Sequence, residues 1–201
     1  TYLPVEDRLG LLDAPFLPFD GMNEHGLAVG MAAVPPGHMR PDPDKETVDS
    51  LMVIREMLDR ASNVDEAVAI LQSYNIDFGG GPPIHYLIAD LLGRSILVEF
   101  YQGEMVVIPS ETPWHLATNF LRASAGESAQ GLCWRYDRIN RWLTEAGGRI
   151  TAQDAMDLLA QVSQGGTQWS IVYGMSSGDV RVTMGHEYDE VHTLRLSLAS
   201  E

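Results

Sequence analysis

The sequence predicts a single α+β domain in which helices pack against antiparallel β-sheet. The chain has 201 residues, the size of one domain, and 45% of them are hydrophobic, which is enough to form a sizeable core. Segments with strand-like composition lie in both halves of the chain, with helical segments between them. Residues 1–201 contain no internal repeat, linker or low-complexity run, so we expect one domain.

The beginning of the chain predicts an extended lead-in followed by a buried strand. Residues 1–19 contain three prolines, which disfavour both a regular helix and a central strand. The turn-forming pair Asp20-Gly21 comes next. Residues 26–34 are short, apolar and followed by a proline-rich polar loop, so they indicate a buried strand.

Two helices are predicted after this loop. Thr47 is placed to cap the first, whose apolar residues recur at helical spacing as far as Leu58. Asn63 has the character of an N-cap, and Glu66 follows at the spacing of a capping box. The Gly-Gly-Gly-Pro-Pro run at residues 79–83 cannot continue a helix and predicts a loop.

The second half of the chain alternates predicted strands and helices. Short β-rich runs joined by glycine-containing turns predict an antiparallel meander, and further strands close the chain. Helical periodicity appears twice between them, interrupted by Gly147-Gly148. The predicted strands are residues 84–91, 95–101, 104–108, 114–119, 169–175, 179–184 and 191–198, and the predicted helices are residues 134–143 and 152–162.

The composition excludes several classes of function. A formal net charge of −15 would repel a phosphate backbone, which argues against nucleic-acid binding. The longest apolar runs fall far short of the roughly 20 residues that cross a bilayer, so no membrane span is expected. The single cysteine, Cys133, cannot form an internal disulfide, which fits a reducing compartment such as the cytoplasm.

Generic cofactor and metal motifs are not supported. The acidic segment at residues 42–46 lacks the glycine and the glutamate of a calcium loop, so we interpret it as a solvated turn. The glycines at 79–81 lack the lysine of a phosphate-binding loop. The six histidines have no metal-ligand spacing, so no metal or cofactor is expected. Two interpretations of Cys133 remain open: a buried inert thiol, or a thiolate activated at a helix N-terminus.

Several separated segments form an ordered set along nearly the whole chain. These are Phe19-Asp20-Gly21-Met22-Asn23-Glu24-His25-Gly26-Leu27-Ala28-Val29, His85-Tyr86-Leu87-Ile88-Ala89-Asp90, Gly93-Arg94-Ser95-Ile96-Leu97-Val98-Glu99-Phe100, Leu116-Ala117-Thr118-Asn119, Arg135 and Trp169-Ser170-Ile171-Val172-Tyr173. Taken together, these segments resemble the choloylglycine hydrolase and penicillin V acylase family of linear-amide C–N hydrolases. Within the first segment, we interpret Asn23 and Glu24 mainly as turn architecture.

The resemblance implies an αββα sandwich and an N-terminal cysteine nucleophile whose own α-amine acts as base. Asn119 matches the oxyanion-hole asparagine, and the backbone N–H of Ala33 matches the second donor. Arg135 matches the arginine beside the nucleophile, where a permanent cation can hold a thiolate. The residues alone leave other readings open: Asn119 could satisfy a strand end, and Arg135 could be a surface helix residue.

The sequence also departs from the family pattern. The family's cysteine, and the arginine and aspartate after it, have no counterpart here, so we expect them upstream of Thr1, with this chain as the C-terminal portion and inactive alone. Thr1 itself is a weaker candidate nucleophile, because the proline-rich lead-in does not make the required strand. Position 33 is Ala where bile-salt hydrolases carry Asn and penicillin V acylases Tyr, and the insertion before the arginine helix is abbreviated.

We therefore expect a hydrolase acting on a small-molecule acyl amide. Two alternatives remain open: an acyltransferase that uses the same acyl-enzyme, and a non-catalytic binding or scaffold protein that retains the fold. The sequence does not decide the acyl group, the amine or the compartment, and it leaves a homo-oligomer open.

Overall fold

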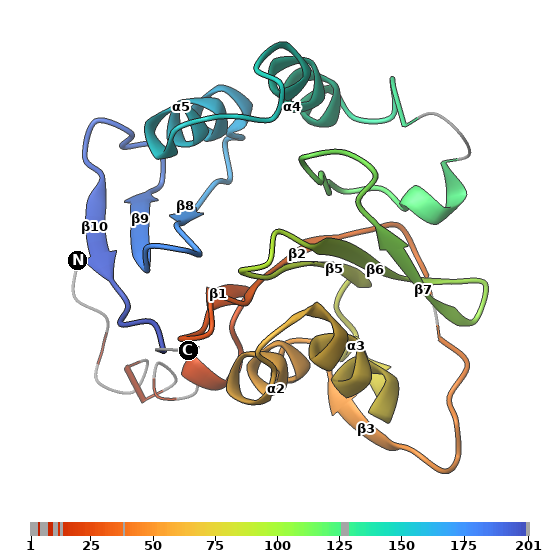
Figure 1. Ribbon diagram of the computed structural model, residues 1–201. Helices are drawn as coiled ribbons and strands as arrows, with labels where there is room; N and C mark the ends of the chain where they lie inside the picture. Colours follow the sequence, from red (N-terminus) through yellow and green to blue (C-terminus); the bar gives the residue numbers. More distant parts are fainter. Residues whose placement is uncertain are drawn as a thin grey trace.

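The protein folds into four layers, with two β-sheets between two pairs of helices (Figure 1). The computed structural model describes residue 4, residues 8–9, residue 12 and residues 14–37, 39–125 and 129–199. Residues 1–3, 5–7, 10–11 and 13 of the lead-in, Thr1 among them, and His38 lie outside the described residues. The layer order, helix, sheet, sheet, helix, is the αββα arrangement that the resemblance implies.

The larger sheet has five antiparallel strands in the order β1-β2-β5-β6-β7. Successive side chains of a strand point to opposite faces of the sheet, so every second side chain lies on the same face. Tyr86 and Ile88 of β5 and Val98 and Phe100 of β6 point to one face and are buried. The strand bounds are β1 (Asp20–Met22), β2 (Ala28–Ala33), β5 (Ile84–Ala89), β6 (Ser95–Tyr101) and β7 (Glu104–Pro109).

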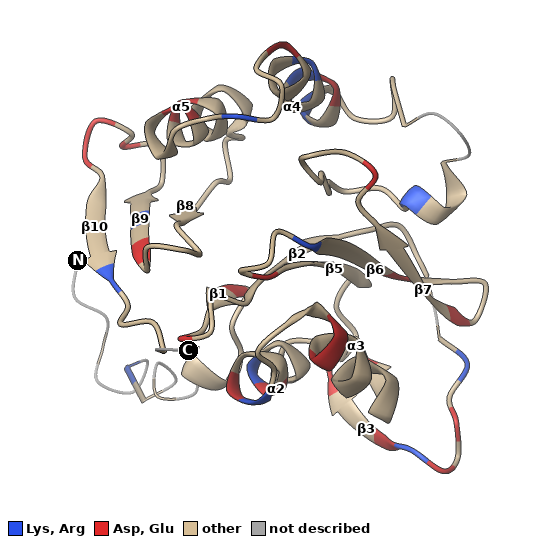
Figure 2. Cartoon of the chain, in the orientation of Figure 1, with Lys and Arg blue, Asp and Glu red and all other residues tan. Residues whose placement is uncertain are grey.

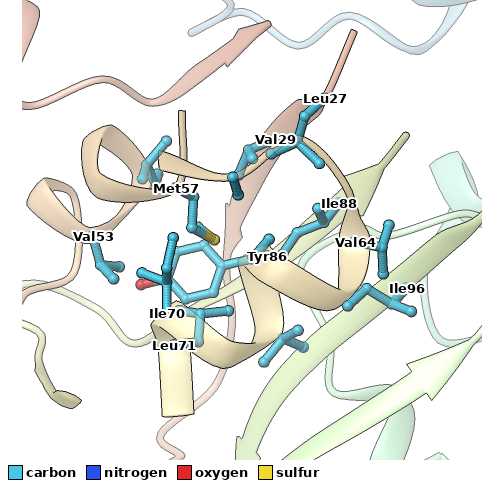
Figure 3. Close-up of a cluster of buried hydrophobic side chains, with 14 of the residues drawn as sticks. Leu27, Val29, Val53, Met57, Val64, Ile70, Leu71, Tyr86, Ile88 and Ile96 are labelled. Carbon is cyan, nitrogen blue, oxygen red and sulfur yellow. The ribbon is translucent and has the colours of Figure 1, made fainter. Parts of the chain in front are cut away.

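Helices α2 (Met52–Arg60) and α3 (Val64–Ser73) cover this buried face of the larger sheet. Their inward side chains, among them Met57 and Leu71, meet Tyr86 and Ile88 in the main hydrophobic core (Figure 3). Asn63 caps α3 as predicted: its side chain accepts from the backbone N–H of Glu66 at 3.1 Å. The core therefore lies on one side of the sheet and leaves the other face to the second sheet.

The smaller sheet contains three antiparallel strands, β8 (Trp169–Tyr173), β9 (Asp179–Met184) and β10 (His192–Arg195), in the order β10-β9-β8. Helix α5 (Ala152–Val162) packs on β8, and α4 (Trp134–Glu145) packs on α5. Thr151 and Asp154 form a complete capping box at the start of α5, which explains why this helix begins where its sequence pattern predicts.

The Asn23 turn joins the larger sheet to α2. The Asn23 amide is 6% exposed and donates to the carbonyl oxygens of Leu58 and Ala61 at 3.0 and 2.7 Å. Its oxygen accepts from the backbone N–H groups of His25 and Leu27. Every hydrogen-bonding position of this amide is used within the protein, which supports a role in turn architecture.

Three sequence-based predictions of secondary structure are wrong. Asp20-Gly21, expected as a turn, belongs to β1. The helix expected from Thr47 begins only at Met52, because residues 46–49 form strand β3 (Glu46–Asp49), which pairs in parallel with the unpredicted β4 (Tyr74–Asp77).

Residues 114–119, expected as a strand, form an irregular loop. Hydrogen bonds from the hydroxyls of Ser110 and Thr112 to the Trp114 carbonyl hold the start of this loop in a turn, which competes with sheet pairing.

Charged residues are distributed over helices, strands and loops (Figure 2). Asp and Glu outnumber Lys and Arg by 28 to 13 in the sequence. Within the described part of the chain, no helix has the length and apolar character that a bilayer span requires.

Candidate active site

A cleft of about 560 Å³ lies between the two sheets. Strands β2 and β5 of the larger sheet line one side, and β8 of the smaller sheet lines the other. The lining residues are Phe19, Asp20, Ala28, Val29, Gly30, Met31, Ala32, Ala33, Leu87, Ala89, Asn119, Arg135, Trp169, Ile171 and Tyr173. A cleft of this volume is in the range that small-molecule ligands occupy.

Small residues on β2 form the base of the cleft. Val29 packs into the core on the helix side, so Ala28, Gly30 and Ala32 face the second sheet. A Cβ atom added to Gly30 would meet no atom within 4 Å. Gly30 is paired with Leu87 of β5 on one side and Asp20 of β1 on the other. The space above Gly30 is therefore part of the cleft and is not filled by core packing.

Asp20 links the two sheets at the cleft wall. Its carboxylate accepts from the Trp169 indole N–H at 2.9 Å and from the Tyr173 hydroxyl. Burial, reinforced by Asp20, raises the pKa of the Tyr173 phenol, so the hydroxyl stays protonated and donates. Phe19 packs edge-on against Trp169, with ring centroids 5.9 Å apart. These contacts tie β8 to β1 and to the residue before it at the wall of the cleft.

The structure brings together the three residues predicted for catalysis. The Asn119 side-chain amide donates to the backbone carbonyl of Ala33 at 2.6 Å. The Arg135 guanidinium donates to the Asn119 side-chain oxygen, also at 2.6 Å. The three residues are separated by up to 102 positions in sequence, from Ala33 to Arg135, yet they form one hydrogen-bonded chain at the cleft.

Ala33 presents its backbone groups at an open edge of β2. Val34 N–H donates to the Pro83 carbonyl at 2.8 Å, which marks a hydrogen-bonded pair of the β2–β5 ladder. Such pairs alternate along an antiparallel ladder, so the backbone groups of Ala33 point away from β5. Strand β1 pairs with β2 only as far as Gly30. The Ala33 N–H therefore lies beyond the end of β1, on the same edge as the carbonyl that Asn119 contacts.

Arg135 fixes the orientation of the Asn119 amide. A guanidinium only donates, and a backbone carbonyl only accepts, so just one of the two flipped orientations satisfies both contacts. In that orientation the NH₂ group lies at the Ala33 edge, and only one of its two hydrogens is needed by the Ala33 carbonyl. The positive charge of the Arg135 guanidinium, next to the amide oxygen, also polarises the amide and strengthens its N–H groups as donors. The arrangement can present oxyanion donors at the cleft.

Cys133 lies at the N-cap of α4, two residues before Arg135. The thiol is partly exposed, so the expectation of a buried thiol is wrong. Burial acts to raise the thiol pKa, but the nearby Thr118 hydroxyl and the backbone N–H groups in the first turn of α4 outweigh it, and the net pKa is lowered. The thiol makes no capping hydrogen bond to α4. The thiol does not belong to the residues that line the cleft.

The structure also shows where the acidic segment at residues 42–46 and the glycines at residues 79–81 lie. Asn75 binds both backbone groups of Asp42 and the Lys45 carbonyl, so the acidic segment is a turn held by β4. Gly79 and Gly80 have positive φ angles, as a turn requires. Among the described residues, no group of three or more His, Cys, Asp or Glu side chains could hold a metal ion.

Comparisons with known proteins agree with this fold. The family described as "Acyl-coenzyme A:6-aminopenicillanic acid acyl-transferase" matches residues 16–185, and the chain belongs to this family. An uncharacterized protein of Paramecium bursaria Chlorella virus 1 is 31% identical over 109 residues, covering 50% of the chain. The chain spans 38% of the length of that curated relative.

Two solved structures share the fold. A mutant of conjugated bile acid hydrolase from Clostridium perfringens has a TM-score of 0.68 and 17% identity, over 89% of this chain and 72% of that one. Penicillin V acylase from Agrobacterium tumefaciens has a TM-score of 0.68 and 16% identity, over 91% of this chain and 67% of that one. The predicted α+β class and the family resemblance are confirmed. Family and fold are consistent with an amide hydrolase or acyl-transferase.

Sequence reasoning missed the second group of residues at the cleft. The sequence pattern indicates a turn at Asp20 and a strand from Trp169 to Tyr173, and the family resemblance includes these residues without giving them a role at the site. The signal that could have found them is the alternation in β8, which places Trp169, Ile171 and Tyr173 on one face of the strand.

Proposed function

We propose that the complete protein breaks a linear amide C–N bond through an acyl-enzyme on a cysteine that these 201 residues do not contain. The cysteine thiolate attacks the amide carbonyl carbon, and the C–N bond breaks as the amine leaves with a proton from the nucleophile's own α-ammonium group. Water then attacks the thioester, releasing a carboxylic acid and restoring the thiol.

The contact chain Ala33–Asn119–Arg135 is the observation that carries this proposal. Attack on an amide places negative charge on the carbonyl oxygen, and catalysis depends on donors already aimed at that oxygen. The Asn119 NH₂ and the Ala33 N–H lie on one strand edge at the cleft. Arg135 holds the amide in the donating orientation. In this role, the Ala33 contribution comes from the backbone, so the alanine side chain does not disqualify the site.

Acyl transfer to a second amine is the other candidate. It is favoured by the family description, which names an acyl-transferase. Both reactions share the first half, because the thioester is the same, and they differ only in whether water or an amine attacks it. The cleft volume of about 560 Å³ leaves room for an acyl group and a second small molecule.

The test uses the complete protein and a panel of N-acyl amides with aliphatic and aromatic acyl groups. We expect release of free amine and, in rapidly quenched samples, a protein mass increased by the acyl group and mapped to a cysteine. Hydrolysis yields the free acid alone, whereas transfer yields a new amide when a second amine is supplied. A complete protein that neither turns over any member nor gains an acyl mass would contradict the proposal and favour a binding role.

A further inference from the structure

A buried histidine and glutamate lie beside the site, and the mechanism above does not use them. His85 of β5 and Glu99 of β6 are both 0% exposed. The His85 Nδ1 lies 3.0 Å from Glu99 Oε1. Their positions follow one pair beyond Tyr86 and Val98 in the ladder register, so they face each other directly across the two strands.

Both side chains point toward the cleft side of the larger sheet. Tyr86 and Val98 face the helix core, and their neighbours His85 and Glu99 therefore face the opposite way. On its other side, His85 is paired with Ala32, the residue before Ala33. The pair thus lies on the face of the sheet that forms the base of the cleft, next to the strand that carries the Ala33 N–H.

Glu99 also holds the loop that carries Asn119. Its Oε1 accepts from the Arg122 backbone N–H at 2.8 Å, and its Oε2 accepts from Ala123 N–H at 2.7 Å. Burial acts to raise the pKa of the Glu99 carboxyl, but the bonds from His85, Ala123 and Arg122 outweigh it, so the pKa is lowered. A carboxylate at this position is therefore ionised and binds both strand and loop.

The loop that carries Asn119 is held by hydrogen bonds at two points, Asn119 and Arg122. Arg135 holds Asn119 from α4, and three residues later Glu99 holds Arg122 from β6. Phe120 is buried between these points and packs edge-on against Tyr136 of α4, with ring centroids 5.3 Å apart. The contact with Arg135 sets the orientation of the Asn119 amide, and the contact with Glu99 sets the distance of the loop from the larger sheet.

We propose that His85 and Glu99 are positioning residues, which fix the Asn119 amide at the Ala33 edge of β2. His85 donates through Nδ1 and so orients the Glu99 carboxylate for the two backbone N–H groups. The His85 Nε2 is buried and has no hydrogen-bond partner within the described part of the chain, so only Nδ1 ties this ring to its surroundings. The inference rests on the proposed function, because it assigns the pair to the Asn119 donor.

Glu99→Gln is the most conservative way to break this arrangement. The replacement keeps the shape but turns one acceptor into a donor, and that donor then faces a backbone N–H of Arg122 or Ala123. Displacing a reacting group by about 1 Å costs on the order of 100-fold in rate, so we expect kcat to fall about 10- to 100-fold. KM should change little, because the pair does not line the cleft.

The experiment is a double-mutant cycle in the complete protein. Kinetics are measured for Glu99→Gln, Asn119→Ala and the double variant, well below each melting temperature. Ile70→Val, a core change in α3 on the other side of the larger sheet, controls for loss of stability alone and should leave kcat unchanged. If Glu99 acts through Asn119, the double variant has the same kcat as Asn119→Ala.

The outcomes separate this inference from the proposed function. Multiplied losses in the double variant, or an unchanged kcat in Glu99→Gln, would overturn the positioning role while leaving the amidase proposal intact. An unchanged kcat in Asn119→Ala would overturn the oxyanion assignment itself, and the positioning role with it.

A second pair of variants decides the question if Glu99→Gln does not fold. The Asn amide in His85→Asn can replace the Nδ1 donor, whereas His85→Ala cannot. We expect His85→Asn to retain most of the kcat that His85→Ala loses. Equal kcat values for the two variants would overturn the role of the Nδ1 donor.

Discussion

Gly30 gives a test of the cleft in which stability and activity are expected to move in opposite directions. Gly30 lies in the middle of β2, and its φ angle is not in the positive region. An added Cβ meets no atom within 4 Å. Gly30→Val should therefore be accepted by the strand without strain. Replacing glycine in a strand by a β-branched residue is expected to stabilise the fold by about 0.5–1 kcal/mol.

The same substitution places three carbon atoms in the cleft, between Asp20 and Leu87. A mismatch of one methylene in an apolar pocket changes kcat/KM about 10- to 200-fold. We expect Gly30→Val to reduce kcat/KM by at least this amount for amides with bulky acyl groups, and by less for acetyl amides. Gly30→Ala should give an intermediate effect.

The assay measures kcat/KM for a series of acyl lengths together with the melting temperature. Gly165→Val is the matched control, since Gly165 also has no atom within 4 Å of an added Cβ, has no positive φ angle and lies outside the cleft. If Gly30→Val kept the wild-type acyl preference, the cleft would not be the acyl site. A large fall in melting temperature would mean that the space above Gly30 is packed.

Three further predictions concern the surroundings of Asn119. Arg135→Met should reduce kcat about 10-fold or more, because the Asn119 amide loses the contact that orients it; steady-state kinetics measure this, and an unchanged kcat would contradict the orienting role. The Cys133 thiol should have a pKa below its ordinary value of about 8.5, because it lies at the N-terminus of α4. The pH dependence of Cys133 alkylation, followed by mass spectrometry, measures this pKa, and a value above about 8.5 would contradict the prediction. The lowered Glu99 pKa should stabilise the fold above the ordinary glutamate pKa of about 4.3, and this contribution should be lost as the pH falls below that value through the folded-state pKa; denaturant unfolding between pH 7 and pH 3 should show a smaller acid loss in Glu99→Gln.

The sequence predicts the elements whose ends are determined by local chemistry. Helix α5 begins at its Thr151 capping box, and the meander β5-β6-β7 follows from short apolar runs joined by glycine turns. Strands β3 and β4 were not predicted, because a parallel pair of four residues each has no local signal and depends on long-range contacts. Asn75 supplies those contacts by binding the Asp42 turn.

The candidate site was predictable in part. The three residues taken from the family resemblance, Ala33, Asn119 and Arg135, are in hydrogen-bond contact. Spacing alone could not place them together, since Asn119 lies in an irregular loop rather than at the end of the predicted strand. His85 and Glu99 are polar residues within otherwise apolar strands, and the strand register could have predicted that they face each other. The hydrogen bonds from the backbone of residues 122–123 to Glu99 could be found only in the structure.

The kinetics of Asn119→Ala in the complete protein test the proposed mechanism most directly. Removing one oxyanion-hole donor typically reduces kcat by about 10² to 10³, roughly 3 to 4 kcal/mol of transition-state stabilisation. Because the Asn119 side chain is exposed at the cleft and not part of the core, KM and melting temperature should stay nearly unchanged. A variant with wild-type kcat, or one that loses stability while its folded fraction turns over normally, would show that Asn119 only secures the loop to β2.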